Sequence, residues 1–307
     1  MTRYFAWRAG QSLLTLLVLL TFIFVAVRLT GDPTSSLLPE VATEEDRAEL
    51  RQALHLDLPI WRQYVAYVAD MASGEFGRSY KWDRPVTEML RDRLPVTATL
   101  ALLGGALTLG IGLPLGIVAA RYQGRAADFA AQGVALVGQS VPIFVLGLLG
   151  ILLFSVKLGW FPVAGVDNPL GYVLPSVTLG WFGVAAMIRV TRASMLNALS
   201  ADYIVAARAK GLRRPQIVYW HALPNALIPI VTIFSLILAT LLTGAVVTET
   251  LFGLPGVGRL AVEAIVTRDF PIVQGVVVFT TTVYILINLL VDLIYGFLDP
   301  RTRQGNR

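Results

Sequence analysis

The feature that most constrains this chain is the alternation of long charge-free apolar tracts with short charged ones. A membrane-spanning helix needs about 20 mostly apolar residues, and six tracts meet or approach that length. Lipid excludes unpaired charges, which explains why the charged residues gather between the tracts. Only 15% of the residues are charged and the mean hydropathy is +0.67. We therefore predict an all-α membrane protein with six transmembrane helices, at about 9–29, 95–120, 129–156, 169–189, 226–248 and 272–297.

The charge-free tract Pro215–Thr248 is too long for one crossing. We expect its first part, up to about Asn225, to lie at the membrane interface and the span to begin near Ala226. Pro224 and Pro229 are consistent with a break there, because proline removes a helical hydrogen bond and clashes with the preceding turn.

Glycine and proline recur inside the predicted spans. Glycine lets two helices approach closely, and proline permits a kink. We therefore predict closely packed, bent helices, with a gating role for some of these residues as the alternative. The positions are Gly104, Gly105, Gly110, Gly112, Pro114, Gly116, Pro142, Gly147 and Gly150.

The distribution of basic residues predicts the orientation of the spans, because cytoplasmic loops are enriched in Lys and Arg. The N-terminus, the 121–128 and 189–214 loops and the C-terminal tail together hold 13 Lys and Arg against three acids. The segment 32–93 holds 8 against 12. We therefore expect both termini in the cytoplasm and 32–93 outside the membrane. The chain has no cysteine, which excludes disulfides and thiolate sites.

Two expectations concern the N-terminal third of the chain. We expect residues 9–29 to be retained as the first span, with a cleaved signal peptide as the alternative, because no small-residue cleavage site follows before Gly31. In 32–93, apolar and aromatic residues such as Trp61, Tyr64 and Val68 recur at helical spacing and predict one or two amphipathic helices. These helices would brace the first span or, alternatively, receive a partner.

The stretch Ser200–Leu212 has the signals of a short helix. Ser200 is a good N-cap, Asp202 suits the positive end of the helix dipole, and Arg208 and Lys210 suit its negative end. Gly211 favours the left-handed conformation that ends a helix. Ten residues predict a helix of about 15 Å. It would be either a connector on the membrane surface or a contact for another protein.

This stretch resembles the Glu-Ala-Ala loop of the membrane subunits of bacterial ABC importers. The general pattern is Glu-Ala-Ala, three residues, Gly, nine residues, Ile, one residue and Leu-Pro. Here Val205-Ala206-Ala207, Gly211, His221 and Leu223-Pro224 keep that spacing, with Val in place of Glu and His in place of Ile. Those departures are similar to the branch that imports dipeptides, oligopeptides and nickel, whose Ala-Arg-Ala-Lys-Gly-Leu and His-Ala-Leu-x-Asn-Ala segments occur at 207–212 and 221–226.

Further stretches along nearly the whole chain resemble the same branch. They are Leu29–Pro33, Leu94–Thr99, Ser140–Phe144, Glu249–Phe252, Leu254–Arg259, Arg268–Pro271, Asn288–Leu293 and Leu298–Arg301. The set in this order is specific, whereas any one of these motifs would be weak.

The resemblance implies a type I ABC importer permease fold in a bacterial or archaeal plasma membrane. This chain would pair with a second, homologous permease subunit around a pore, served by two cytoplasmic ATPase subunits and an extracytoplasmic solute-binding protein. The sequence has no Gly-x-x-x-x-Gly-Lys-[Ser/Thr] phosphate loop, which agrees with ATP hydrolysis on another chain. We expect no cofactor on this chain, and membrane lipid rather than nucleic acid as its remaining partner.

Residues 200–224 would then be the cytoplasmic coupling loop, with its helix seated in a cleft of an ATPase. We expect the small residues Ala206, Ala207 and Gly211 to pack closely against that partner. The other coupling candidates are Arg208 and Lys210, as polar contacts, and Leu223 and Pro224.

Polar residues at membrane depth are candidates for a structural pair or a gate. Asn288 and Asp292 share a helix face with Tyr295 and Asp299, and we expect Asp292 to pair with Arg189 or Arg192; a gate or solute contact is the alternative. We expect His221 to brace the coupling loop through Asp202 or a backbone carbonyl. His221 and His55, the only histidines, are predicted on opposite sides of the membrane, so we expect no metal site.

The run Gly253–Gly258 superficially suggests a nucleotide loop. It follows the end of a span rather than a buried strand, so we predict an extracytoplasmic turn. The resemblance implies that this turn helps to close the outer mouth of the pore.

We therefore predict the translocation subunit of an ATP-driven importer, without catalysis of its own, for di- or oligopeptides. Nickel, glutathione or another small solute is the alternative cargo. The predicted spans contain no His-Glu-x-x-His, Gly-x-Ser-x-Gly or paired aspartates, which disfavours an intramembrane enzyme. A membrane receptor or scaffold is the other alternative, and neighbouring genes for an ATPase and a binding protein would distinguish transport from both.

Overall fold

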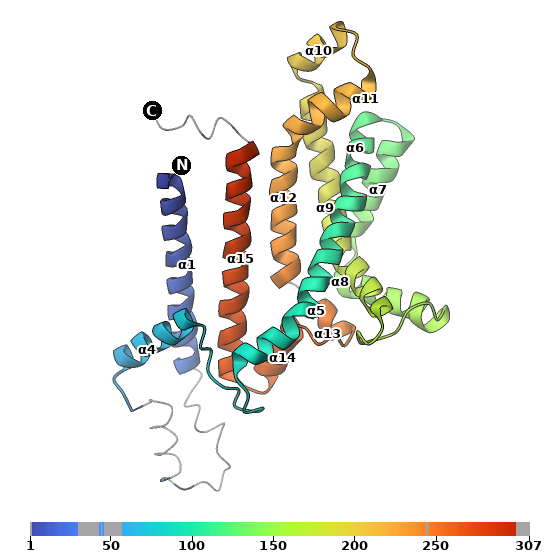
Figure 1. Ribbon diagram of the computed structural model, residues 1–307. Coiled ribbons are helices and arrows are strands. Elements are labelled where there is room, and N and C mark those ends of the chain that lie inside the picture. The colour runs from blue at the N-terminus through green and yellow to red at the C-terminus, as the bar shows by residue number, and fades with distance from the viewer. Residues whose placement is uncertain (1, 30–42, 44, 46–56, 244, 299–307) are drawn as a thin grey trace. The chain divides into compact units, whose positions relative to one another are not determined.

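The computed structural model describes residues 2–29, 43, 45, 57–243 and 245–298, and the described part is almost entirely helical (Figure 1). It comprises two units, residues 1–94 with 259–285 and residues 95–258 with 286–307. The predicted motifs at 29–33 and 298–301 fall largely outside the described residues, as do His55, Asp299 and most of the first half of 32–93.

The chain order of the helices is as follows. The α-helices are α1 (Thr2–Leu29), α4 (Ile60–Ser73), α5 (Val86–Leu107), α6 (Leu113–Arg121), α7 (Ala126–Ser140), α8 (Ile143–Gly150), α9 (Val173–Leu199), α10 (Asp202–Ala209), α11 (Arg214–Gln216), α12 (Leu223–Thr243), α13 (Val246–Leu251), α14 (Val257–Val266) and α15 (Phe270–Leu298). Between them lie the π-helical segments η1 (Thr108–Gly112), η2 (Ile151–Lys157) and η4 (Ile217–Ala222), and the 3-10 turn η3 (Pro169–Tyr172).

Five described helices are long and apolar enough to cross a membrane, and a sixth depends on one broken helix. The five are Gly10–Leu29, Val86–Arg121, Pro169–Leu199, Arg214–Leu242 and Phe270–Val291. The predicted span 129–156 is broken, because α7 and the helix formed by α8 and η2 meet at 101°. Val141 at this bend is extended, with φ −89° and ψ 121°, as expected for a residue that precedes proline.

The predicted break at Pro224 and Pro229 is wrong, because α11, η4 and α12 form one helix over Arg214–Leu242. Pro224 lies in the first turn of α12, directly after η4, and Pro229 lies inside α12. Local π-helical adjustments and neighbouring helices can satisfy the backbone groups that proline leaves unpaired, so transmembrane helices tolerate it.

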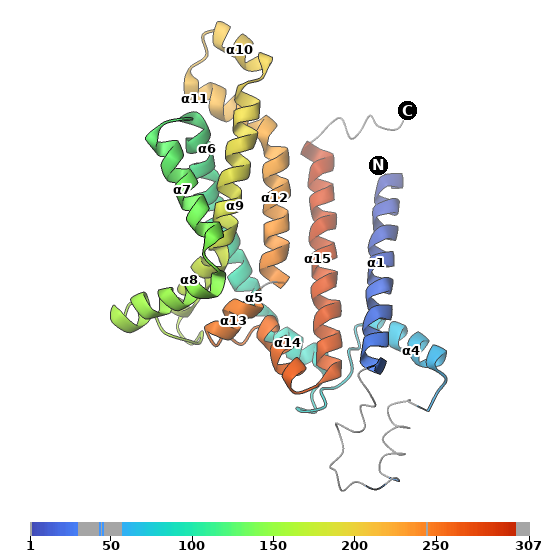
Figure 2. The same cartoon turned by 180° about the vertical axis from the view of Figure 1, so that it is seen from behind.

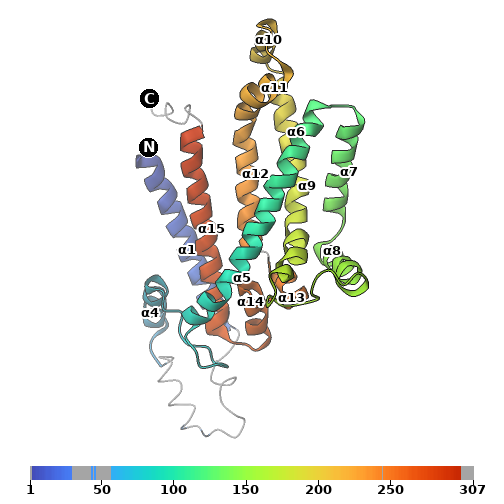
Figure 3. The same cartoon turned by 45° about the vertical axis from the view of Figure 1, so that its right-hand side comes forward.

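The second unit is built around α9, which η1 and α6 cross along a row of small residues that starts near the end of α5 (Figure 3). The row repeats every fourth residue at Gly104, Thr108, Gly112 and Gly116. A Cβ atom placed on Gly116 would lie 2.5 Å from the Cβ of Thr191 on α9, and one on Gly112 would lie 2.7 Å from the Cβ of Met187. Close helix packing is thus confirmed for these glycines.

Not every glycine in these spans has that role. A Cβ on Gly147 would lie 2.4 Å from a methyl carbon of Leu251, so this position also has no room for a side chain. Gly110, in contrast, has no neighbouring atom within 4 Å of that position, and close packing does not explain it.

In the first unit, α4 packs against α1 (Figure 2). The hydroxyl groups of Thr21 and Tyr64 are 2.7 Å apart, and the ring of Phe24 meets that of Tyr64 edge-on at 5.3 Å. The Nε of Arg28 donates a hydrogen bond to the Oε1 of Gln63 at 3.0 Å. These contacts support the interpretation of this amphipathic helix as a brace for the first span.

Candidate functional site

The predicted coupling helix forms, but it begins differently from the prediction. α10 covers Asp202–Ala209, so its eight residues span about 12 Å. Ser200 does not cap it: its hydroxyl donates to the carbonyl oxygen of Asn197 at 3.0 Å and so belongs to the end of α9. Ala201 occupies the N-cap position and makes no side-chain capping bond.

The end of α10 matches the prediction. Gly211 has φ +78°, which disfavours residues with a Cβ atom. The N–H of Leu212 donates to the carbonyl of Ala207 at 3.3 Å, and the N–H of Gly211 donates to that of Arg208 at 2.9 Å. Gly211 therefore ends the helix and turns the chain toward α11.

α10 has one buried and one exposed face. Ile204 and Ala207 are buried in the apolar cluster of the second unit, which also contains Ile217 and Val218 of η4. The Ala207 side chain thus packs mainly inside its own chain, and its predicted contact with another chain stays a prediction. Ala206 and Val205 are exposed.

The remaining coupling candidates separate into two groups. Arg208, Lys210 and Gly211 lie on the exposed surface of the α10 segment. Leu223 and Pro224 lie in the first turn of α12, with Leu223 half-buried. In both views α10 projects beyond the ends of α9 and α12, at the end of the second unit away from α8 and α13 (Figures 1 and 2).

His221 lies in η4, and the predicted hydrogen bonds of its ring are not formed. Its backbone carbonyl accepts a hydrogen bond from the Nδ2 of Asn225 at 2.8 Å. Within the described part of the chain, the ring makes no hydrogen bond to Asp202 or to a backbone carbonyl. Nor do the described residues contain a group of His, Asp and Glu side chains that could hold a metal ion.

Arg192, one of the two predicted partners of Asp292, forms an ion pair with Asp128. The Nε and Nη2 of Arg192 donate to the two carboxylate oxygens of Asp128 at 2.6 and 2.8 Å. Asp128 is 1% exposed and also accepts hydrogen bonds from Gln132 and from the N–H of Gly124. This bidentate pair joins the start of α7 to α9. α15 continues through Asn288 and Asp292, but the Asp292 side chain lies outside the described residues.

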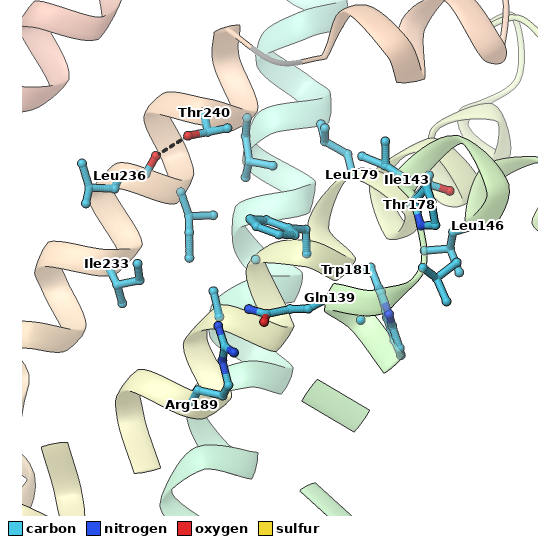
Figure 4. A pocket seen from close by; sticks show the side chains of 18 residues that line it. Gln139, Ile143, Leu146, Thr178, Leu179, Trp181, Arg189, Ile233, Leu236 and Thr240 are labelled. Atoms are coloured by element: carbon cyan, nitrogen blue, oxygen red, sulfur yellow. Dashed lines mark hydrogen bonds between the residues drawn. The ribbon is translucent and has the colours of Figure 1, made fainter. Parts of the chain in front are cut away.

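Arg189, the other predicted partner of Asp292, lines a cavity of about 620 Å³ (Figure 4). The cavity lies at the bend between α7 and α8 and is bounded by α9 and α12. Its walls are mainly apolar, and Arg189 and Gln139 reach into it from α9 and α7. Among the described residues that line the cavity, Arg189 alone is ionisable. A cavity of this volume lies within the range of small-molecule sites.

Glu249, which was not among the predicted site residues, is completely buried in the second unit. Its Oε1 accepts a hydrogen bond from the Oγ1 of Thr97 at 2.6 Å. The same Thr97 Oγ1 accepts a hydrogen bond from the N–H of Val257 at 2.9 Å. A Cβ atom on Gly256 would lie 2.1 Å from the Cδ of Glu249. Residues 253–256 thus form a turn packed against a buried carboxylate, as predicted, whereas Val257 and Gly258 begin α14. The only sequence signal was that Glu249, Thr97 and Gly256 all fall within the motifs of the resemblance.

A second buried carboxylate, Asp269, organises the first unit. Its Oδ2 accepts hydrogen bonds from the hydroxyl of Ser79 at 2.6 Å and from the N–H of Lys81 at 3.1 Å. Burial raises the pKa of the nearby Tyr80 phenol, and the Asp269 carboxylate raises it further, against an opposing effect of Arg28. Asp269 directly precedes α15 and therefore holds the loop at 79–82 against the start of that helix.

Comparison with known proteins agrees with the resemblance. A family described as "Binding-protein-dependent transport system inner membrane component" matches residues 112–304, and its N-terminal counterpart matches residues 1–101. The dipeptide transport system permease protein DppB of Escherichia coli (strain K12) is 38% identical over 320 residues, covering 94% of each chain.

Solved structures show the same fold at lower identity. A chain of the MetNI methionine ABC transporter in an inward-facing conformation has a TM-score of 0.59 at 21% identity, covering 69% of this chain and 96% of that chain. A chain of an amino acid ABC transporter has a TM-score of 0.53 at 17% identity, covering 70% and 94%.

Proposed function

Because this chain belongs to the family of binding-protein-dependent transport system inner membrane components, we propose that it forms part of the translocation path of an ATP-driven importer for di- and oligopeptides. It is a multi-pass plasma-membrane permease with the fold of ABC importer membrane subunits. The peptide cargo is the part of the proposal that goes beyond family membership.

The observation that carries the peptide assignment is the cavity at the bend between α7 and α8. Its apolar walls accept side chains of varied shape, which a peptide path requires. Arg189 supplies one cation and Gln139 one amide, a combination that suits the carboxylate and peptide group of a short peptide. The 38% identity with a dipeptide permease over nearly the whole chain supports the same cargo.

The exposed face of α10 supports coupling to a separate ATPase. The helix is short, ends at a left-handed glycine and presents Ala206, Arg208 and Lys210 outward, while Ile204 and Ala207 attach it to η4. Movement of a partner seated on that face would be transmitted through η4 to α12, which follows it without interruption.

The proposed assembly contains this chain, a homologous permease, two ATPases and a solute-binding protein. In this arrangement α10 and both termini lie in the cytoplasm. The chain itself is non-catalytic and needs no cofactor, since hydrolysis takes place on the ATPases and solute selection is mainly the task of the binding protein.

Uptake into vesicles tests the cargo directly. The complete complex is reconstituted with its binding protein and ATP, and labelled di-, tri- and longer peptides, nickel and glutathione are offered separately. We expect ATP-dependent accumulation of peptides. Uptake of nickel or glutathione alone would contradict the peptide assignment while leaving the importer intact, and no ATP-dependent uptake of any solute would contradict the transport function.

A further inference from the structure

A second cavity, of about 640 Å³, lies at the α10 end of the second unit. Four arginines line it: Arg121 at the end of α6, Arg125 at the N-cap of α7, Arg208 on α10 and Arg214 at the start of α11. None of the described residues that line it is acidic. Four elements thus bring positive charge to one concave surface.

These positive charges are not neutralised within the described part of the chain, where none of the four arginines forms an ion pair. Like charges gathered around one cavity repel one another and attract an anion. The guanidinium group is planar and presents its N–H donors as a fork that matches the oxygens of a phosphate. The cavity is therefore suited to a phosphate group.

The apolar part of the lining indicates what carries that phosphate. Leu196, Leu199 and Ile217 line the cavity together with the arginines. An inorganic anion has no apolar groups to bury against such a surface, whereas the glycerol and first methylene groups of a phospholipid would bury apolar area there.

Exposed aromatic residues place the cavity at the level of the lipid headgroups. Tyr122 lines the cavity, and Tyr219 and Trp220 follow directly after two of its lining residues in η4. Tyr219 is 48% exposed and Trp220 77%. Tyr and Trp concentrate where a membrane meets water, and α6, α9 and η4 all belong to helices long enough to cross it.

We propose that this cavity binds the phosphate of an anionic phospholipid. The phosphate would join Arg208 and Arg214, from the α10 and α11 segment, to Arg121 and Arg125 at the ends of α6 and α7. Basic pockets between the ends of transmembrane helices are suited to such headgroups. Ala206 and Lys210 on the exposed face of α10 would remain free for another chain, because neither of them lines the cavity.

Lipid binding to the purified complex tests the proposal. The complex is prepared in a neutral detergent and titrated with phosphatidylglycerol or phosphatidylcholine of the same chain length, and the bound lipid is counted by native mass spectrometry. We expect at least tenfold preference for phosphatidylglycerol. Each of the variants Arg121→Gln, Arg125→Gln and Arg214→Gln should weaken its binding about fivefold, and the triple variant on the order of a hundredfold.

The matched control removes the same charge elsewhere, with Arg62→Gln, Arg91→Gln and Arg213→Gln, none of which lines the cavity. It should bind phosphatidylglycerol within twofold of the wild type. Equal binding by the wild type and the cavity triple variant would overturn the proposal, and the single variants keep this test available if the triple variant fails to fold.

The bound anion could instead be inorganic phosphate or an acidic group of the ATPase, and each of these gives a different experimental result. If millimolar inorganic phosphate displaces phosphatidylglycerol, the cavity is a site for a soluble anion and the lipid assignment is wrong. If the triple variant loses its ATPase subunits in detergent that contains no anionic lipid, the arginines contact acidic groups of the ATPase, which also overturns it. Both readouts are independent of the cargo, so a failure of the peptide proposal would leave this one intact.

Discussion

Glu249 is an acidic residue with no exposed surface, held beside Gly256 and the hydroxyl of Thr97. A carboxyl group is retained in such a place only if hydrogen bonds replace its contacts with water. The bond from Thr97 and the tight packing of Gly256 show that the turn after α13 is built around this side chain. Its position after an apolar tract gave no indication of such burial.

Replacing Glu249 with alanine should remove this support. The hydroxyl of Thr97 would lose an acceptor and a void would open beside Gly256, so we expect Glu249→Ala to destabilise the protein by about 3 kcal/mol. Glu249→Gln keeps the shape and an acceptor oxygen and should cost less than half as much. Thermal unfolding of the purified protein in detergent measures both.

The exposed Glu88 provides the control for this comparison. Glu88→Ala should change stability by no more than about 0.5 kcal/mol. If Glu249→Ala unfolds at the same temperature as the wild type and as Glu88→Ala, Glu249 does not support the turn.

At the scale of the element, two adjacent alanines on α10 point about 100° apart and meet different surroundings. Ala206 is exposed, whereas Ala207 is buried in the same apolar cluster as η4. The two residues are of the same type and adjacent in the sequence. Only the direction of each side chain on the packed helix distinguishes them.

The same substitution at these two positions should therefore have different effects, on uptake in one case and on stability in the other. We expect Ala206→Glu to leave stability within about 0.5 kcal/mol of the wild type and to abolish ATP-dependent uptake, because it introduces bulk and charge on the proposed ATPase contact. Ala207→Glu would bury an unpaired charge and should lower stability by several kcal/mol. Thermal unfolding and retention of the ATPase on the purified permease distinguish the two effects, and normal uptake by Ala206→Glu would contradict the coupling role.

At the scale of the whole molecule, the cavity at the bend between α7 and α8 exists because segments about 100 residues apart meet there. Gln139 comes from α7, Arg189 from α9 and Thr240 from α12. Arg189 has the properties of a functional residue at membrane depth, since it is charged, exposed and directed into a cavity.

Arg189→Gln should therefore lower uptake selectively. A charge-assisted hydrogen bond contributes about 1.5–3 kcal/mol, so we expect uptake of a dipeptide with a free carboxylate to fall at least tenfold. Uptake of the C-terminally amidated dipeptide should change little, and Arg91→Gln, at an exposed position that does not line the cavity, should affect neither. Equal losses for both peptides would show that Arg189 has a structural role instead.

The sequence alone determined the class of the protein, most of its spans and the end of α10. These features depend on local properties: the length of an apolar tract and the freedom of Gly211 to adopt a positive φ. The motif spacing between Val205 and Pro224 was also visible without a structure and led to the family that the comparisons show.

Tertiary structure alone decided which side chains pair with one another and which face of each helix is buried. It assigned Arg192 to Asp128, buried Ala207 while exposing Ala206, continued one helix through Pro224 and Pro229, and gathered four arginines from four elements around one cavity. Each of these depends on which segments meet after the helices pack, and helix periodicity does not encode that rotation. The pattern of apolar residues fixes where a helix lies along the chain, whereas contacts between distant segments fix what its side chains touch.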